Sequence, residues 1–295
     1  MKEILIISGK GGTGKTTVTA ALGDIAAKNK HIVLADADVD AANLELLLDP
    51  KIEQTYPFIG GKIAVIDRTS CIACGRCEEV CRFDAVSHST EDTYTIDSAF
   101  CEGCGACVHQ CPVEAIQIQS HQSGEWYRSS SSYGPLLHAN LFPGEENSGK
   151  LVTQVKEDAR TYGKEARAEI LLIDGPPGIG CPVTAALSGV DSTVIVSEPT
   201  LTGFHDMKRV KAVADFFKIP TQLVINKSDL NPQIQKEMLG FADEIGMRLA
   251  GMIPYDEKIM AAQLQNRPIT RSLPEEYLPL FTQMWIEISA GSNHN

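Results

Sequence analysis

The stretch Gly9-Lys10-Gly11-Gly12-Thr13-Gly14-Lys15-Thr16 decides the fold. It fits the pattern G-x-x-x-x-G-K-S/T, in which glycines let backbone N–H groups turn inward around phosphate oxygens. The apolar run Glu3–Ser8 predicts a strand before it, and small and apolar residues at helical spacing predict a helix over Lys15–Lys28 after it. The N-terminus of that helix would add the positive end of its dipole. A chance glycine turn is the alternative, and the flanking strand and helix argue against it.

The pattern assigns contacts to a bound nucleotide. Lys15 should reach the β- and γ-phosphates, Thr16 should bind Mg²⁺ through its hydroxyl, and Thr17 should contact the α-phosphate. The residues expected to bind the nucleotide here are Gly11, Gly12, Thr13, Gly14, Lys15, Thr16 and Thr17.

The α/β rhythm around this loop predicts the fold class. A second strand, Ile32–Ala35, ends on Asp36, and strand, helix and strand at this length form a βαβ unit. Helical patterns over His205–Phe217 and Gln233–Ile245 separate further apolar runs. Those predicted strands are Ile170–Ile173, Thr193–Val196, Gln222–Ile225 and Leu249–Ile253. We predict an α/β P-loop NTPase fold, with a mainly parallel sheet flanked by helices.

Composition narrows the class of partner. The 295 residues are 43% hydrophobic and carry a net charge of −12, which argues against a nucleic-acid surface and against an anionic membrane face. The chain has no recognisable secretory signal and no apolar run near the ~18 residues of a membrane span. We therefore expect a cytoplasmic protein that binds neither nucleic acid nor membrane.

Eight of the nine cysteines repeat one spacing between positions 71 and 111, and in an intracellular protein this indicates metal binding. Each run has the spacing C-x₂-C-x₂-C-x₃-C of a bacterial two-cluster ferredoxin, in which the fourth cysteine ligates the other cluster. One [4Fe–4S] cluster should take Cys71, Cys74, Cys77 and Cys111, and the other Cys101, Cys104, Cys107 and Cys81. The first run ends in Cys81-Arg82 instead of Cys-Pro, which leaves ligation intact. Structural zinc is the alternative, but it usually takes paired C-x₂-C units with a long gap.

The cysteine region interrupts the α/β pattern. We predict a first ATPase part over 1–61, a small ferredoxin-like α+β insertion over 62–120, a connecting loop region over 121–150 and a second ATPase part over 151–295. The run Ser129-Ser130-Ser131-Ser132 is typical of a loop, and so is the segment 142–149. Whether the clusters carry electrons or only stabilise the insertion stays open.

Lys10 gives the phosphate loop the form K-G-G-T-G-K-T-T, the deviant Walker A motif. In this the chain resembles the MinD/ParA/Mrp ATPases and the related nitrogenase iron protein. The resemblance implies an ATP-dependent homodimer in which Lys10 reaches the partner's phosphates, as an arginine finger does. Two subunits would enclose two ATP molecules, and hydrolysis would open the dimer.

The same resemblance extends to two acidic segments. Asp36–Asn43 is similar to the first switch of the family, which implies that Asp38 orients or deprotonates the attacking water. Asp174 ends a predicted buried strand like a Walker B aspartate, so its carboxylate should hold Mg²⁺. A helix N-cap is the alternative for Asp174, and a capping or solvated role is the alternative for Asp38.

Base recognition rests on weaker signals. Asn226, in Asn226-Lys227-Ser228-Asp229, should contact adenine, and Pro254 and Asp256 should close the other side of the base. The N-K-x-D pattern also occurs in GTPases, where its aspartate selects guanine. We favour ATP because the deviant loop is more specific than this tetrapeptide.

Three further features have two interpretations each. Cys181 is either an incidental free thiol or half of a two-thiol metal site across a dimer. The segment 144–150 is either a solvated loop or a partner contact. The amphipathic stretch Glu275–Ile288 lacks the basic residues of a membrane-binding helix, so we expect it to pack on the core.

These observations predict an ATPase that couples a dimeric switch to two [4Fe–4S] clusters. The expected uses are ATP-gated electron transfer to a redox partner, or assembly of an iron–sulfur or mixed-metal centre in a metallocluster protein. The alternative is a ParA/MinD-like protein-positioning switch with a redox-sensing iron–sulfur module.

Overall fold

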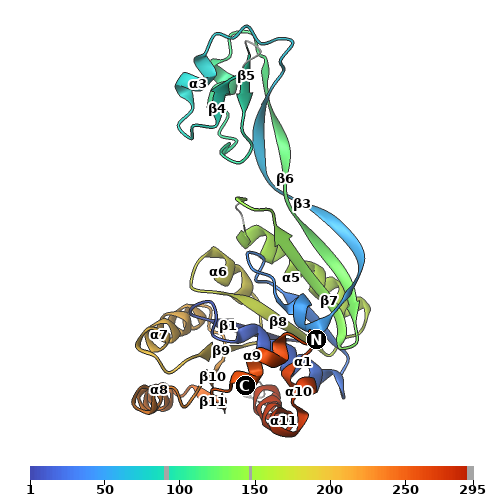
Figure 1. Ribbon diagram of the computed structural model, residues 1–295, viewed down its shortest axis with the longest axis vertical. Helices are drawn as coiled ribbons and strands as arrows, with labels where there is room; N and C mark the ends of the chain where they lie inside the picture. The colour runs from blue at the N-terminus through green and yellow to red at the C-terminus, as the bar shows by residue number, and fades with distance from the viewer. Residues whose placement is uncertain (90–92, 146–147, 291–295) are drawn as a thin grey trace. The chain divides into compact units, whose positions relative to one another are not determined.

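The computed structural model describes residues 1–89, 93–145 and 148–290 (Figure 1). The chain divides into two compact units. The larger unit comprises Met1–Tyr56, Trp126–Asn140 and Ser148–Asn295. The other, which we call the cysteine unit, comprises Pro57–Glu125 and Leu141–Asn147.

A nine-stranded sheet organises the larger unit, in the order β11-β10-β9-β1-β8-β2-β7-β6-β3. Adjacent strands are parallel from β11 through β7. The strands are β1 (Lys2–Ser8), β2 (Ile32–Asp36), β3 (Lys51–Ile66), β6 (Ile116–Ser131), β7 (Gly134–Leu141), β8 (Ile170–Pro177), β9 (Ser192–Ser197), β10 (Thr221–Asn226) and β11 (Arg248–Ile253). The predicted α/β fold with a mainly parallel sheet is confirmed.

Helices cover the sheet on both faces, which is why its central strands are continuous apolar runs. In β1 the residues Ile4 and Ile6 join a core with α1 (Lys15–Ala27), α2 (Leu44–Leu48) and α11 (Pro274–Ala290). Two helices, α5 (Ser148–Glu165) and α6 (Cys181–Leu187), pack against β8. Helix α7 (Leu201–Phe216) packs against β9, and α8 (Pro232–Glu244) packs against β11. Two short helices, α9 (Glu257–Gln263) and α10 (Ile269–Ser272), precede α11.

The C-terminal helix packs on the core, as predicted. Tyr277, Phe281, Met284 and Ile288 are buried along one side of α11. Within the described part of the chain, no helix has the length and apolar character needed to cross a membrane.

The predicted loop over 121–150 is wrong in most of its length, because β6 continues to Ser131 and β7 covers Gly134–Leu141. Serine has a low preference for strands, but hydrogen-bond partners can offset that preference. Ser129 Oγ lies 2.9 Å from His138 Nε2, and Ser131 Oγ donates to the Gly134 carbonyl across the turn at 2.6 Å. Of the segment 144–150, Glu146 and Asn147 lie outside the described residues.

The cysteine unit is built on a repeat. Two five-residue helices, α3 (Arg76–Val80) and α4 (Ala106–Gln110), each begin after a glycine with positive φ, Gly75 or Gly105. A small antiparallel pair, β4 (Val86–His88) and β5 (Tyr94–Ile96), lies between the two halves in the sequence.

Candidate nucleotide and cysteine sites

The phosphate loop lies between β1 and α1, at the carboxyl ends of the parallel strands. Gly14 has a φ of +87°, and a Cβ there would lie 2.3 Å from Asn226 Nδ2. Both the backbone and the space therefore require glycine. Asn226 Nδ2 in turn donates to the Thr13 carbonyl at 2.8 Å, so the end of β10 supports the loop.

Lys15 lies buried between two of the predicted carboxylates. Its Nζ is 3.2 Å from Asp38 Oδ2 and 3.5 Å from Asp174 Oδ1. Burial lowers the pKa of Lys15, but the attraction of Asp174, Asp38 and Asp36 outweighs burial and leaves that pKa raised. The ammonium is therefore held charged where a phosphate would arrive.

Asp174 is fully buried and lies within β8, which continues to Pro177 and does not end at Ile173 as predicted. Its carboxylate accepts hydrogen bonds from the Thr16 hydroxyl at 2.7 Å and the Thr19 hydroxyl at 2.9 Å. Thr16 and Asp174 thus bring a hydroxyl and a carboxylate together, and hard oxygen ligands of this kind suit Mg²⁺.

Asp36 fixes the loop that follows β2. Its two carboxylate oxygens accept the backbone N–H groups of Asp38 and Leu44, both at 3.0 Å, and so hold the start and end of residues 37–43. Burial, with repulsion from Asp174, raises the pKa of Asp36 to about 8. Asn43 points into this loop, where its amide donates to the Ala41 carbonyl.

Lys10 is ion-paired within its own chain to a residue that the sequence analysis did not single out. Its Nζ lies 3.1 Å from Glu198 Oε2, and Lys227 Nζ lies 2.5 Å from Glu198 Oε1. Burial raises the pKa of Glu198, but hydrogen bonds from Lys227 and Lys10 outweigh it and hold the pKa below its usual value. Its position in the sequence could have indicated this role, because Glu198 directly follows β9 and so lies at the same edge of the sheet as the phosphate loop.

A cavity with about 1020 Å³ of empty volume adjoins the phosphate loop. The predicted residues Gly12, Gly14, Thr17, Asn226, Pro254 and Asp256 all line it. Asp229, the aspartate of the N-K-x-D pattern, accepts the Tyr255 backbone N–H at 2.7 Å. Asp256 accepts the Lys258 backbone N–H at 2.8 Å and the Tyr277 hydroxyl at 2.9 Å, and these bonds lower its pKa.

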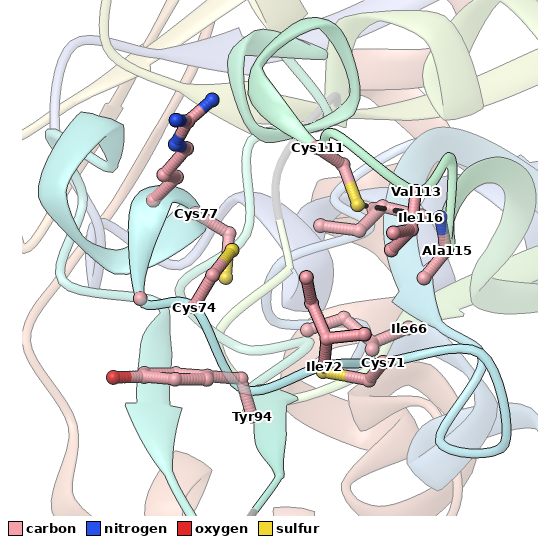
Figure 2. A pocket seen from close by; sticks show the side chains of 12 residues that line it. Ile66, Cys71, Ile72, Cys74, Cys77, Tyr94, Cys111, Val113, Ala115 and Ile116 are labelled. Carbon is pink, nitrogen blue, oxygen red and sulfur yellow. Dashed lines mark hydrogen bonds between the residues drawn. The ribbon is translucent and has the colours of Figure 1, made fainter.

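The structure groups the eight cysteines around two cavities. Cys71, Cys74, Cys77 and Cys111 line one of about 320 Å³, together with apolar side chains such as Ile72 (Figure 2). The other, of about 330 Å³, is lined by Cys81, Cys101, Cys104 and Cys107. These are the two groups of four that the spacing predicts.

Among the residues that the structure describes, no three His, Cys, Asp or Glu side chains converge closely enough to hold one metal ion. A [4Fe–4S] cluster binds each cysteine through a different iron, so its ligands stand apart around a volume.

The two cysteine sites share one backbone plan. Positive φ recurs at Ala73 and Gly103 and at the glycines before α3 and α4. Backbone N–H groups donate to sulfur from Ala73 to Cys71 and from Ala64 to Cys101. All nine cysteines are free of disulfides, and burial raises the pKa of the Cys77 and Cys107 thiols.

Comparison with known proteins identifies the family of the chain. The family model of the CobQ/CobB/MinD/ParA nucleotide binding domain matches residues 4–269. The uncharacterized protein MJ0578 of Methanocaldococcus jannaschii is 38% identical over 229 residues, which cover 78% of this chain and 79% of that protein. The septum site-determining protein MinD of Synechocystis is 25% identical and covers 90% of this chain and 80% of its own.

Among solved structures, the fold is similar to that of the septum site-determining protein MinD from Pyrococcus horikoshii, complexed with Mg-ADP. The TM-score is 0.59 at 18% identity, with 97% of this chain and 95% of that chain covered.

Proposed function

Because the chain belongs to the CobQ/CobB/MinD/ParA nucleotide-binding family and is a P-loop ATPase, we propose that it is an ATP-dependent dimeric switch whose cysteine unit holds two [4Fe–4S] clusters. One observation carries the proposal: the chain that has the buried Lys15–Asp38–Asp174 site also has two cavities with four cysteines each. The first arrangement supports ATP hydrolysis, and the second supports a pair of clusters.

Lys15 would exchange its carboxylate partners for the phosphates of ATP, while Thr16 and Asp174 hold Mg²⁺. The metal would neutralise phosphate charge. Asp38 loses its ion pair when Lys15 turns to the nucleotide. Burial already raises the pKa of Asp38 and Lys15 opposes that effect, so the freed carboxylate is a better proton acceptor for an attacking water.

Lys10 would act across a homodimer. In the single chain it lies on Glu198, with a side chain that is 34% exposed, so it can leave without unfolding the loop. Glu198 keeps Lys227 as a partner. The exchange of Lys10 from its own Glu198 to the partner's phosphates would link dimer closure to ATP.

The lining of the cysteine cavities fits clusters by its chemistry. Each has four thiols facing a largely apolar space, and no disulfide competes for them. Cys71, Cys74, Cys77 and Cys111 would hold one cluster, and Cys81, Cys101, Cys104 and Cys107 the other. Such clusters supply one-electron transfer. Free thiols and clusters also fit a reducing cytoplasm.

Among uses of such a switch, positioning of a protein partner with redox sensing in the cysteine unit is favoured by the MinD relatives. Electron delivery to a redox or metallocluster partner, or cluster assembly, is a second candidate. It is favoured by the pairing of two cavities with four cysteines each in one small unit.

The test is an anaerobic preparation in which iron, acid-labile sulfide and ATP hydrolysis are measured together. We expect about eight irons per chain and hydrolysis that depends on Lys10. An EPR redox titration with and without Mg·ATP then separates the two uses. A potential that moves with nucleotide favours electron delivery, and an unchanged potential favours the switch with a sensor. Iron below one cluster per chain after anaerobic reconstitution would refute the cluster half of the proposal.

A further inference from the structure

The chain passes between the two units at four places, which we call the crossings. They lie after Tyr56 in β3, before Trp126 in β6, after Asn140 at the end of β7, and immediately before Ser148 at the start of α5. β6, β7 and α5 are therefore the elements of the larger unit, besides β3, at which the chain enters or leaves the cysteine unit.

The loop 37–43, which we call the first switch segment, is bonded to two of these elements. Asp36 holds Leu44 at the far end of the loop. The next residue, Glu45 of α2, places its Oε2 3.0 Å from Nδ1 of His138 in β7. The other ring nitrogen of His138 lies 2.9 Å from Ser129 Oγ in β6.

This link is buried where it meets the strands. His138 is 1% exposed and Ser129 is 3% exposed. The contact of His138 with Glu45 lowers the pKa of the Glu45 carboxyl. His138 Nδ1 lies within ion-pair distance of Glu45 Oε2 but makes no well-aligned hydrogen bond to it. The contact can therefore break and form again when α2 shifts.

Residues 175–180, the second switch segment, lead directly into α6, and α6 packs against α5. At the start of α6, Gly149 of α5 lies close enough that a Cβ on it would be 3.4 Å from Cys181 Cβ. At its end, the buried Lys156 Nζ donates to the carbonyls of Ala185 at 2.9 Å, Ala186 at 2.5 Å and Ser188 at 2.9 Å.

Lys156 is 1% exposed, and its described bonds go to carbonyl groups. A cation at the C-terminus of a helix satisfies carbonyls that lack an intrahelical partner and complements the helix dipole. Burying an ammonium is costly because the charged group loses its hydration. This burial lowers the pKa of Lys156 to about 8. The arrangement holds α6 and α5 together as one body.

We propose that Glu45, His138 and Lys156 are positioning residues that connect the two switch segments to the crossings of the cysteine unit. The inference rests on the proposed nucleotide switch. A nucleotide that shifts residues 37–43 would act on β6 and β7 through His138, and one that shifts residues 175–180 would act on α5 through Lys156. Both routes end on chain that continues into the cysteine unit.

Hydrogen–deuterium exchange of the full chain, with and without a non-hydrolysable ATP analogue, tests this coupling. In the wild type we expect the analogue to change exchange rates within residues 93–125 by about fivefold or more, the scale of an ordinary allosteric coupling. His138→Leu and Lys156→Met should each remove most of that change. Lys156→Arg, which keeps the cation, should retain it.

Thr193→Val is the matched control. It is nearly isosteric and removes an equally buried hydrogen bond, from Thr193 Oγ1 to the Leu5 carbonyl at 3.0 Å, in strands that contain no crossing. If His138→Leu fails to fold, Glu45→Gln takes its place, because it alters the same contact at a residue that is 30% exposed. If Lys156→Met fails to fold, Lys156→Gln takes its place, because it removes the charge and keeps a polar donor.

The proposal is overturned if both variants keep the wild-type response, if Thr193→Val loses it equally, or if the wild type has no response. Iron content and nucleotide binding, measured on the same samples, test the proposed function independently of the coupling. A response in residues 93–125 of a protein without iron would refute the clusters and support the coupling, whereas absence of nucleotide binding would refute both.

Discussion

The nucleotide site and the cysteine sites differ in whether their functional groups have partners within the chain when no ligand is bound. In the larger unit, Lys15 is paired with Asp38 and Asp174, and Lys10 is paired with Glu198. In the cysteine unit, the thiols face cavities, and cysteines form much of the core itself. Two of the six buried residues of that core, Cys77 and Cys107, belong to the proposed sites. We therefore expect the larger unit to fold before its ligand arrives, and the cysteine unit to depend on the proposed clusters for its core.

The strongest test of this comparison is to remove the proposed iron. Chelation of iron under anaerobic conditions should unfold the cysteine unit and leave the larger unit folded. Structural metal sites contribute on the order of 10 kcal/mol to folding, and a unit this small has little other core. Limited proteolysis should then cut within residues 57–125 while residues 148–290 stay protected.

Single cysteine variants provide the controls for that experiment. Cys77→Ser and Cys107→Ser should each lower the iron content and produce the same cleavage. Cys181→Ser lies outside both cavities and should change neither, which would also argue against a metal site at Cys181. A cysteine unit that resists protease after complete iron removal would show that the comparison is mistaken.

The next largest effect is expected at Lys10. Lys10→Ala should reduce ATP hydrolysis by about 10³-fold and leave nucleotide affinity nearly unchanged, because a lysine supplied across a dimer acts on the transition state. Lys211→Ala removes a partly buried lysine of α7 that pairs with the exposed Asp215, and it should leave hydrolysis as in the wild type. Equal turnover of Lys10→Ala and wild type under saturating ATP would refute the action of Lys10 in trans.

Asp36 allows a test of the charge balance in the nucleotide site. Its pKa is raised to about 8 in the folded chain, from an ordinary value of 3.8. The folded state therefore keeps the proton that the unfolded state loses, and the associated stability is complete below pH 4 and is lost as the pH rises through about 8.

Asp36→Asn should remove that dependence. Between about pH 6 and pH 9, the wild type should lose on the order of 2 kcal/mol of unfolding free energy that the variant does not lose. Urea unfolding followed by far-UV circular dichroism at the two pH values measures the difference. Parallel losses in both proteins would place the titrating group elsewhere.

Sequence patterns were sufficient where one local rule dominates. Apolar runs and the glycine loop located the parallel sheet, and the cysteine spacing anticipated which four cysteines share a cavity. The patterns failed over Ser129–Ser132, because the partner of Ser129 is His138 on another strand. Glu198 and Lys156 were missed for the same reason, since their roles come from contacts with residues distant in the chain.

The smallest effect concerns the ion pair that holds Lys10 in its own chain. Glu198→Gln should weaken the hold on Lys10 and increase ATP hydrolysis by up to about fivefold, because a partly exposed ion pair contributes about 0–1 kcal/mol. The increase should disappear in the double variant with Lys10→Ala, since the freed side chain is then absent. Turnover at saturating ATP, measured for the two single variants and the double variant, separates this effect from any loss of Lys227 binding to Glu198. A decrease in the Glu198→Gln variant would mean that Glu198 assists Lys10 during hydrolysis and does not hold it back.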